Sequence, residues 1–117
     1  MRKRVLTVGL GIAGMAAAIA LRDAGWSPVI VERAPERRRG GYFVGLMPEG
    51  RRAAADLGVT ADLHVRDPDG GGAAWDLDRR GKRAPGRGFL DQPGHPAAMI
   101  RGDVEAALWE GVSERGH

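Results

Sequence analysis

Cysteine is absent from the 117-residue chain. Without a thiol, the protein has no disulfide, no thiolate nucleophile and no cysteine ligand for a metal ion. A cysteine-free composition fits a reducing compartment, and we therefore expect a cytoplasmic protein. The length corresponds to one domain or a piece of one, so residues 1–117 are treated as a single unit.

Lysine and aromatic residues are scarce. Lys3 and Lys82 are the only lysines, aromatic residues make up 5% of the chain, and the formal net charge is +3. The basic clusters "MRKR", "ERRRGG" and "DRRGKRAPGR" lie among acidic residues, and no aromatic residues alternate with them. They lack the stacking platform of a nucleic-acid interface, so we expect solvated faces and no nucleic-acid partner. A basic interaction module is the non-enzymatic alternative.

The sequence also lacks convincing catalytic and metal-binding patterns. None of the three histidines has an acidic or histidine partner at metal-ligand spacing: His64, His95 and His117. The aspartates between residues 67 and 78 lack the glycine and glutamate of a calcium loop. The tryptophans are expected to be packing residues: Trp26, Trp75 and Trp109. We therefore expect no metal ion and assign no catalytic side chain.

The N-terminus has two interpretations. "MRKR" and the uncharged residues 5–21 resemble the basic and apolar regions of a signal peptide. However, the glycines gather in the first half of this run and the alanines in the second. The following "RDAGWSPVIVER" reads as a helix end and a strand. We therefore favour a strand, a turn and a helix, and expect no membrane segment.

Residues 4–32 predict a βαβ unit with a right-handed crossover. Residues 4–8 and 27–32 are short apolar segments typical of buried parallel strands. Residues 12–23 form an alanine-rich helix that Gly25 ends. One face of this helix is predicted to lie on the sheet: Ala16, Ile19, Ala20 and Asp23. The fold class is therefore α/β.

The rest of the chain predicts a small hairpin and two further helices. A Pro at its start and Gly58 at its end bound a helix over residues 48–57. Residues 73–78 and 81–89 form a hairpin, in which Pro85 weakens the second arm. The remaining expectations are a loop over 33–45, a turn over 67–72, a loop over 90–96, a strand over 98–101 and an amphipathic helix over 102–115.

The turn "GLGIAG" lies between the first predicted strand and the first helix. Gly9 permits a tight turn, Gly11 allows the backbone to approach a pyrophosphate, and Gly14 lets the helix pack closely on the strand. The free N–H groups at the helix start, including those of Ile12 and Ala13, form an anion site with the helix dipole. This arrangement predicts a Rossmann-type dinucleotide site.

Glu32 lies 18 residues beyond Gly14, at the end of the second strand. Its carboxylate can accept hydrogen bonds from both hydroxyls of an adenosine ribose, and its charge disfavours a 2′-phosphate. The alternative is a βαβ unit whose glycines serve packing alone. The motif by itself does not distinguish FAD from NAD.

The segment "VLTVGLGIAGMAAAIALRDAGWSPVIVERAP" resembles the start of the p-hydroxybenzoate hydroxylase-like FAD-dependent monooxygenases. "GGYFVGLMPEGRRAAADLGV" and "MIRGDVEAALWEGV" extend the resemblance over essentially the whole chain. It implies that FAD is the cofactor and that Arg101 reaches it beyond its ADP half. It also implies that Arg33 flanks the adenosine end and that the loop through Gly45 runs near the flavin ring.

The family resemblance further implies an activity: NAD(P)H reduces FAD, and one atom of O2 passes to an aromatic or polyketide-like substrate. Leu10 departs from the small residue usual between the first two glycines. The family's Asp-Gly flavin segments and its substrate domain have no counterpart here, so the fold is incomplete relative to the family. We expect an inactive isolated chain that a homo-oligomer or a second chain completes.

Besides the basic interaction module, two alternatives to the monooxygenase interpretation remain open. An NAD-dependent oxidoreductase lacks support, because Tyr42 is the only tyrosine and no Tyr-x-x-x-Lys pair occurs. A non-catalytic fragment is the other.

Overall fold

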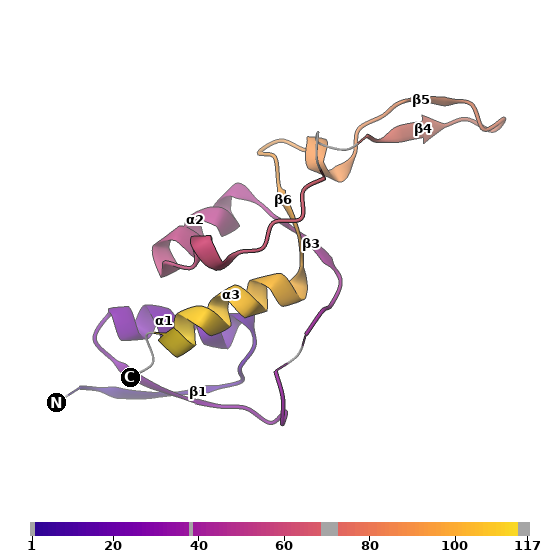
Figure 1. Ribbon diagram of the computed structural model, residues 1–117. Coiled ribbons are helices and arrows are strands. Elements are labelled where there is room, and N and C mark those ends of the chain that lie inside the picture. The colour runs from indigo at the N-terminus through magenta and orange to yellow at the C-terminus, as the bar shows by residue number, and fades with distance from the viewer. Residues whose placement is uncertain (1, 38, 69–72, 115–117) are drawn as a thin grey trace.

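The computed structural model describes residues 2–37, 39–68 and 73–114 (Figure 1). Three helices lie together above a two-stranded parallel sheet, and a hairpin projects from them (Figure 1). Residues 69–72 of the predicted turn lie outside the described residues, and so do Arg115 and His117.

The βαβ unit is confirmed. Strand β1 (Arg4–Val8) leads into helix α1 (Ile12–Asp23), and strand β2 (Ser27–Val31) follows. The two strands are parallel and pair Leu6 with Val29. Gly25 has a φ of 88°, a left-handed conformation that favours glycine and ends the helix. This geometry places the turn after β1 beside the end of β2.

A second sheet joins distant segments. Strand β3 (Phe43–Leu46) is antiparallel to strand β6 (Ala97–Ile100), with Val44 opposite Met99. The prediction of a loop over residues 33–45 is therefore wrong for residues 43–45, which belong to β3. Phe43–Leu46 is too short to carry a clear alternating pattern, and its pairing partner lies about fifty residues later.

The core lies between the helices. Helix α2 (Pro48–Leu57), the short 3₁₀ helix η1 (Thr60–Asp62) and helix α3 (Arg101–Glu114) enclose it together with α1. Its buried members are Met15, Ile19, Ala54, Val59, Ala107 and Leu108. Ala20 is exposed, so the predicted sheet-facing surface of α1 is partly wrong. Helix α1 buries its larger side chains against α3, because a two-stranded sheet offers too little surface to cover them.

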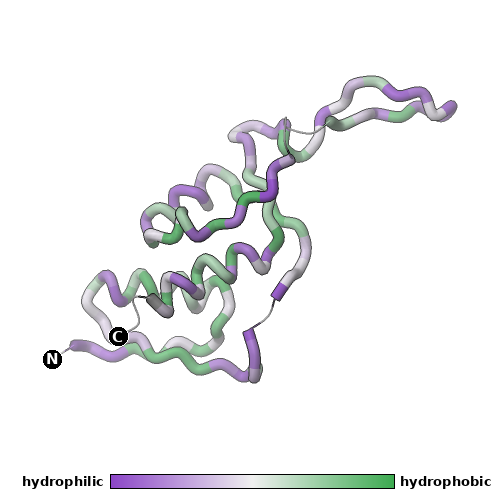
Figure 2. Tube along the Cα trace, viewed as in Figure 1, coloured by the Kyte–Doolittle hydropathy of each residue, from purple (hydrophilic) through white to green (hydrophobic). Residues whose placement is uncertain are grey.

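The other face of the parallel sheet is uncovered. Its aliphatic side chains are exposed: Leu6, Val8, Val29 and Val31. We call these four residues the open sheet face. Figure 2 shows the apolar character of β1 and β2 along this side of the molecule. A parallel sheet is normally buried on both faces, so this surface lacks its usual covering layer.

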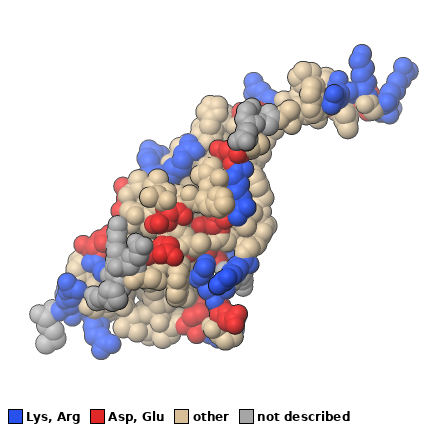
Figure 3. Space-filling view, viewed as in Figure 1, with Lys and Arg blue, Asp and Glu red and all other residues tan. Residues whose placement is uncertain are grey.

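The predicted hairpin is present and projects from the body (Figure 1). It consists of β4 (Trp75–Leu77) and β5 (Arg83–Pro85). The hairpin extends the chain to a radius of gyration of 18.2 Å, whereas a compact domain of this size has about 13 Å. Trp75 is 48% exposed beneath the Arg83 guanidinium, so its prediction as a packing residue is wrong. Figure 3 shows Lys and Arg gathered on the hairpin, which confirms a solvated basic cluster there.

None of the helices in the described parts of the chain combines the length and apolar character needed to cross a bilayer.

Candidate functional site: the cavity beside the glycine turn

The glycine turn between β1 and α1 uses each glycine differently. Gly9 has a φ of +105°, which L side chains rarely adopt. A Cβ on Gly14 would overlap the carbonyl oxygen of Gly9, so only glycine fits there. A Cβ on Gly11 would have no atom within 4 Å. The turn therefore packs tightly at Gly14 and leaves open space in front of Gly11.

The start of α1 presents free backbone donors to that space. Gly11 is the N-cap and supplies no side-chain cap, and the Met15 N–H donates to the Gly11 carbonyl at 3.0 Å. The N–H groups of the first helical turn, including those of Ile12 and Ala13, have no acceptor within the helix. With the helix dipole, these groups favour an anion at this end.

Glu32 follows β2 directly and lies against the glycine turn. Its Oε2 accepts the Leu10 N–H at 2.6 Å, and its Oε1 accepts the Ala34 N–H at 3.0 Å. The hydrogen bonds from the Ala34 and Leu10 amides hold the pKa of Glu32 below its ordinary value. Each carboxylate oxygen retains acceptor capacity, so the group can also receive ligand hydroxyls.

A cavity of about 290 Å³ lies in front of the turn. One wall consists of the glycine turn and the segment after β2, and the other is a face of α3. Its lining residues are Leu10, Gly11, Glu32, Ala34, Pro35, Glu36, Arg37, Arg101, Glu105 and Trp109. The α3 members are four residues apart, which places them on one side of the helix. The cavity therefore combines carboxylates, guanidinium groups and one aromatic ring.

Arg101 is the first residue of α3. Its Nη1 lies 2.5 Å from Oε1 of Glu105, one turn along the helix. Its backbone N–H donates to the Tyr42 carbonyl at 2.9 Å. Two glycines allow close packing at this junction. A Cβ on Gly41 would approach the Arg101 Cβ to 3.1 Å, and a Cβ on Gly102 would overlap the Gly40 backbone. The backbone and the side chain of Arg101 are both anchored.

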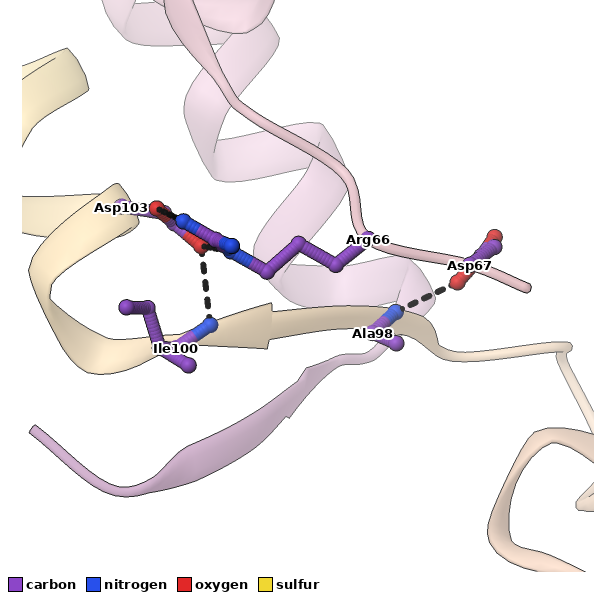
Figure 4. A network of polar contacts seen from close by, with 5 residues as sticks. All are labelled: Arg66, Asp67, Ala98, Ile100 and Asp103. Atoms are coloured by element: carbon purple, nitrogen blue, oxygen red, sulfur yellow. Dashed lines mark hydrogen bonds and ion pairs between the residues drawn. The ribbon is translucent and has the colours of Figure 1, made fainter.

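A second anchor holds the same junction from the other side (Figure 4). The Arg66 guanidinium donates to both carboxylate oxygens of Asp103, at 2.7 and 3.0 Å. Asp103 also accepts the Ile100 N–H at 2.9 Å, and Asp67 accepts the Ala98 N–H at 2.7 Å. The Arg66 hydrogen bond, aided by the Ile100 amide, holds the pKa of Asp103 below its ordinary value. We call Arg66 and Asp103 the α3 clasp.

The structure brings three sequence-predicted residues into one cavity: Gly11, Glu32 and Arg101. Arg33 is exposed and lines a separate shallow hollow on the side of Gly9 and Val31. Gly45 lies in β3 outside the cavity lining, where a Cβ would overlap the Phe89 ring. Its missing side chain is therefore accounted for by packing.

Most of the other lining residues were not predicted from the sequence, among them Arg37, Glu105 and Trp109. Glu105 carried a usable signal, because an acid four residues after an arginine on a helix predicts an ion pair. Trp109 contacts the helical core while also lining the cavity, and the Arg37 guanidinium lies 5.8 Å from its ring centroid. No group of three or more potential metal ligands occurs among the described residues.

The known proteins that the chain resembles are hydroxylases and monooxygenases. No family model matches the chain. The chain is 34% identical over 123 residues to a 3-hydroxybenzoate 6-hydroxylase of Polaromonas naphthalenivorans, covering 96% of this chain and 29% of that protein. It is 37% identical over 87 residues to the FAD-dependent monooxygenase ausM of Aspergillus calidoustus, covering 65% of this chain and 19% of that protein.

Solved structures agree with this relationship. The tetrameric form of 2-methyl-3-hydroxypyridine-5-carboxylic acid oxygenase superposes with a TM-score of 0.77 at 26% sequence identity. The match covers 98% of this chain and 30% of that one. The chain thus spans less than a third of the length of each of these relatives.

Proposed function

The chain is a relative, over 96% of its length, of the FAD-dependent monooxygenases of the aromatic-hydroxylase type, and from this relationship we propose that it binds FAD in the cavity beside the glycine turn. One observation carries the proposal: the helix start at Gly11, the carboxylate of Glu32 and the guanidinium of Arg101 line the same cavity. A dinucleotide-binding turn places a helix start and a ribose-binding carboxylate within one ligand length, and the family resemblance adds the arginine.

The glycine turn and Glu32 offer groups that complement the ADP half of FAD. The free N–H groups of Ile12 and Ala13 bind the pyrophosphate, which approaches closely because Gly11 has no side chain. Glu32 accepts the ribose hydroxyls with the acceptor capacity left by its two amide bonds. Its negative charge repels a 2′-phosphate, so an unphosphorylated ribose is preferred.

The other three predicted site residues are assigned places along FAD outside the pyrophosphate and ribose. Arg101 meets FAD beyond the ADP half, and Arg33 flanks the adenosine from its exposed position beside Glu32. Gly45 does not line the cavity. Its proposed place near the flavin ring rests on the family resemblance of the loop that leads into β3.

When bound, FAD supplies the redox and oxygen chemistry, and this chain's residues bind and orient it. We assign no catalytic side chain. The complete enzyme uses NAD(P)H and O2 on a small aromatic or polyketide-like substrate, and further polypeptide, from a second copy or another chain, completes the fold over the open sheet face.

The test is a titration of the purified chain with FAD, ADP, NAD and NADP. Glu32→Ala is compared with Glu49→Ala, which removes an exposed carboxylate on α2 outside the cavity. We expect FAD and ADP affinity to fall about tenfold or more in Glu32→Ala and to stay unchanged in Glu49→Ala. Equal affinities in both variants would refute the ribose assignment.

A further inference from the structure

Glu105 is a buried carboxylate, and a buried charge needs a paired cation. It lies on α3 with 5% of its surface exposed, and its side chain is paired with Arg101. Among the residues that the structure describes, Arg101 is the cation paired with it. A buried carboxylate that loses its cation is strongly unfavourable, so each member of the pair restrains the other.

The pair faces the cavity. Both residues line it, together with Gly11 and Glu32 on the opposite wall. The Arg101 side chain is 25% exposed, whereas that of Glu105 is 6% exposed. The carboxylate therefore lies behind the guanidinium, at the base of the wall. One ion pair occupies part of the five-donor guanidinium and leaves other N–H groups for a ligand.

We propose that Glu105 is a positioning residue of the cofactor site: it holds the Arg101 guanidinium against the α3 wall in the orientation that meets bound FAD. This inference rests on the proposed function, because FAD is the ligand that Arg101 serves. A free arginine side chain samples many rotamers, and binding a ligand through it costs that freedom. Fixing it before the ligand arrives removes that ordering cost from the binding step.

Two substitutions of Glu105 separate positioning from charge. Glu105→Gln keeps an acceptor for the Arg101 Nη1–H and removes the negative charge. Glu105→Ala removes both. A role through Arg101 predicts opposite outcomes, because the glutamine still orients the guanidinium and also unmasks its charge towards a phosphate.

The experiment titrates the 117-residue chain and its variants with FAD and with ADP, with Glu110→Gln as the control on an exposed part of the same helix. We expect Glu105→Gln to bind FAD as tightly as the wild type or more tightly. We expect Glu105→Ala to lose about fivefold or more in FAD affinity with a much smaller change for ADP. In an Arg101→Ala background, Glu105→Gln should have no further effect on FAD affinity.

Each contrary result is informative. Equal effects of glutamine and alanine, or an effect of Glu105→Gln that persists without Arg101, would overturn the positioning role. Parallel losses for FAD and ADP with a lowered thermal midpoint would assign Glu105 to folding and also overturn it. A wild-type chain that binds neither ligand would overturn the proposed function, and this inference with it.

Discussion

The carboxylate of Glu32 accepts the backbone N–H of Leu10 at 2.6 Å, across 22 residues of sequence. This bond ties the end of β2 to the turn after β1, and so joins the two halves of the dinucleotide motif. It fixes Glu32 beside the open space in front of Gly11 before any ligand is present. The same carboxylate is thus both a structural brace for the turn and a candidate ribose acceptor.

Two of the three glycines of the turn, Gly11 and Gly14, should respond differently to a methyl group. Gly14→Ala forces the new Cβ onto the Gly9 carbonyl, and we expect it to lower the free energy of unfolding by about 1–3 kcal/mol. Gly11→Ala adds its Cβ to open space at an ordinary backbone φ of −91°. It should leave the urea midpoint nearly unchanged and weaken ADP binding. Equal stability losses in both variants would contradict this division of roles.

Arg101→Ala should separate the two halves of the cofactor. The arginine is proposed to act beyond the ADP half, so we expect about a tenfold loss of FAD affinity and nearly intact ADP affinity. Arg80→Ala is the matched control, because Arg80 is an exposed arginine of the hairpin outside the cavity lining. Equal losses for both ligands, or none for either, would count against the assigned position of Arg101.

The α3 clasp predicts an acid limb in the stability profile. The pKa of Asp103 is below its ordinary value, chiefly because Arg66 donates to it. A lowered folded-state pKa means that the unfolded chain takes up this proton first as the pH falls. The clasp therefore contributes its full stabilisation above the ordinary pKa and loses it as the pH falls through the folded-state value.

Asp103→Asn should flatten this acid limb and lower the urea midpoint at neutral pH. Asp56→Asn is a suitable control, because Asp56 is an exposed aspartate on α2. Identical pH profiles for the wild type and Asp103→Asn would show that the clasp does not carry the effect.

The open sheet face predicts self-association of the isolated chain. Leu6 and Val29 pair across the strands, as do Val8 and Val31, and together they expose one aliphatic surface. We expect a concentration-dependent mass in sedimentation equilibrium that Val8→Thr reduces. Val65→Thr is the control, because Val65 is 47% exposed away from this sheet. A monomer at all concentrations would contradict the prediction.

The same incomplete covering predicts that the isolated chain is no working oxygenase. With FAD added, it should show no NAD(P)H oxidation coupled to hydroxylation of a panel of phenols. Product formation by a stable monomer would mean that the segments found only in the longer relatives are dispensable.

Local signals in the sequence were sufficient for the elements that build the site. Residues 4–8, 12–23 and 48–57 were predicted with the observed bounds, because glycine, proline and apolar runs mark them locally. The place of Glu32 at the end of β2 followed from the same signals.

Non-local relationships could not be predicted in this way. Strand β3 depends on pairing with β6, and the bond between Arg66 and Asp103 spans 37 residues. Trp75 reads as a core residue by composition, yet the projecting hairpin leaves it exposed. The α3 wall of the cavity likewise exists only because the fold returns Arg101 to the glycine turn.

The most direct test of the central claim is an amide ¹H–¹⁵N correlation spectrum of the labelled chain during titration with ADP. The account predicts saturable shifts of the N–H signals of Gly11, Ile12, Ala13 and Gly14, because these groups are proposed to bind the pyrophosphate. The exposed hairpin residue Arg80 should not shift beyond the effect of added salt. Unchanged signals from the glycine turn at saturating ADP, or shifts confined to the basic hairpin, would contradict the proposal that this cavity holds the dinucleotide.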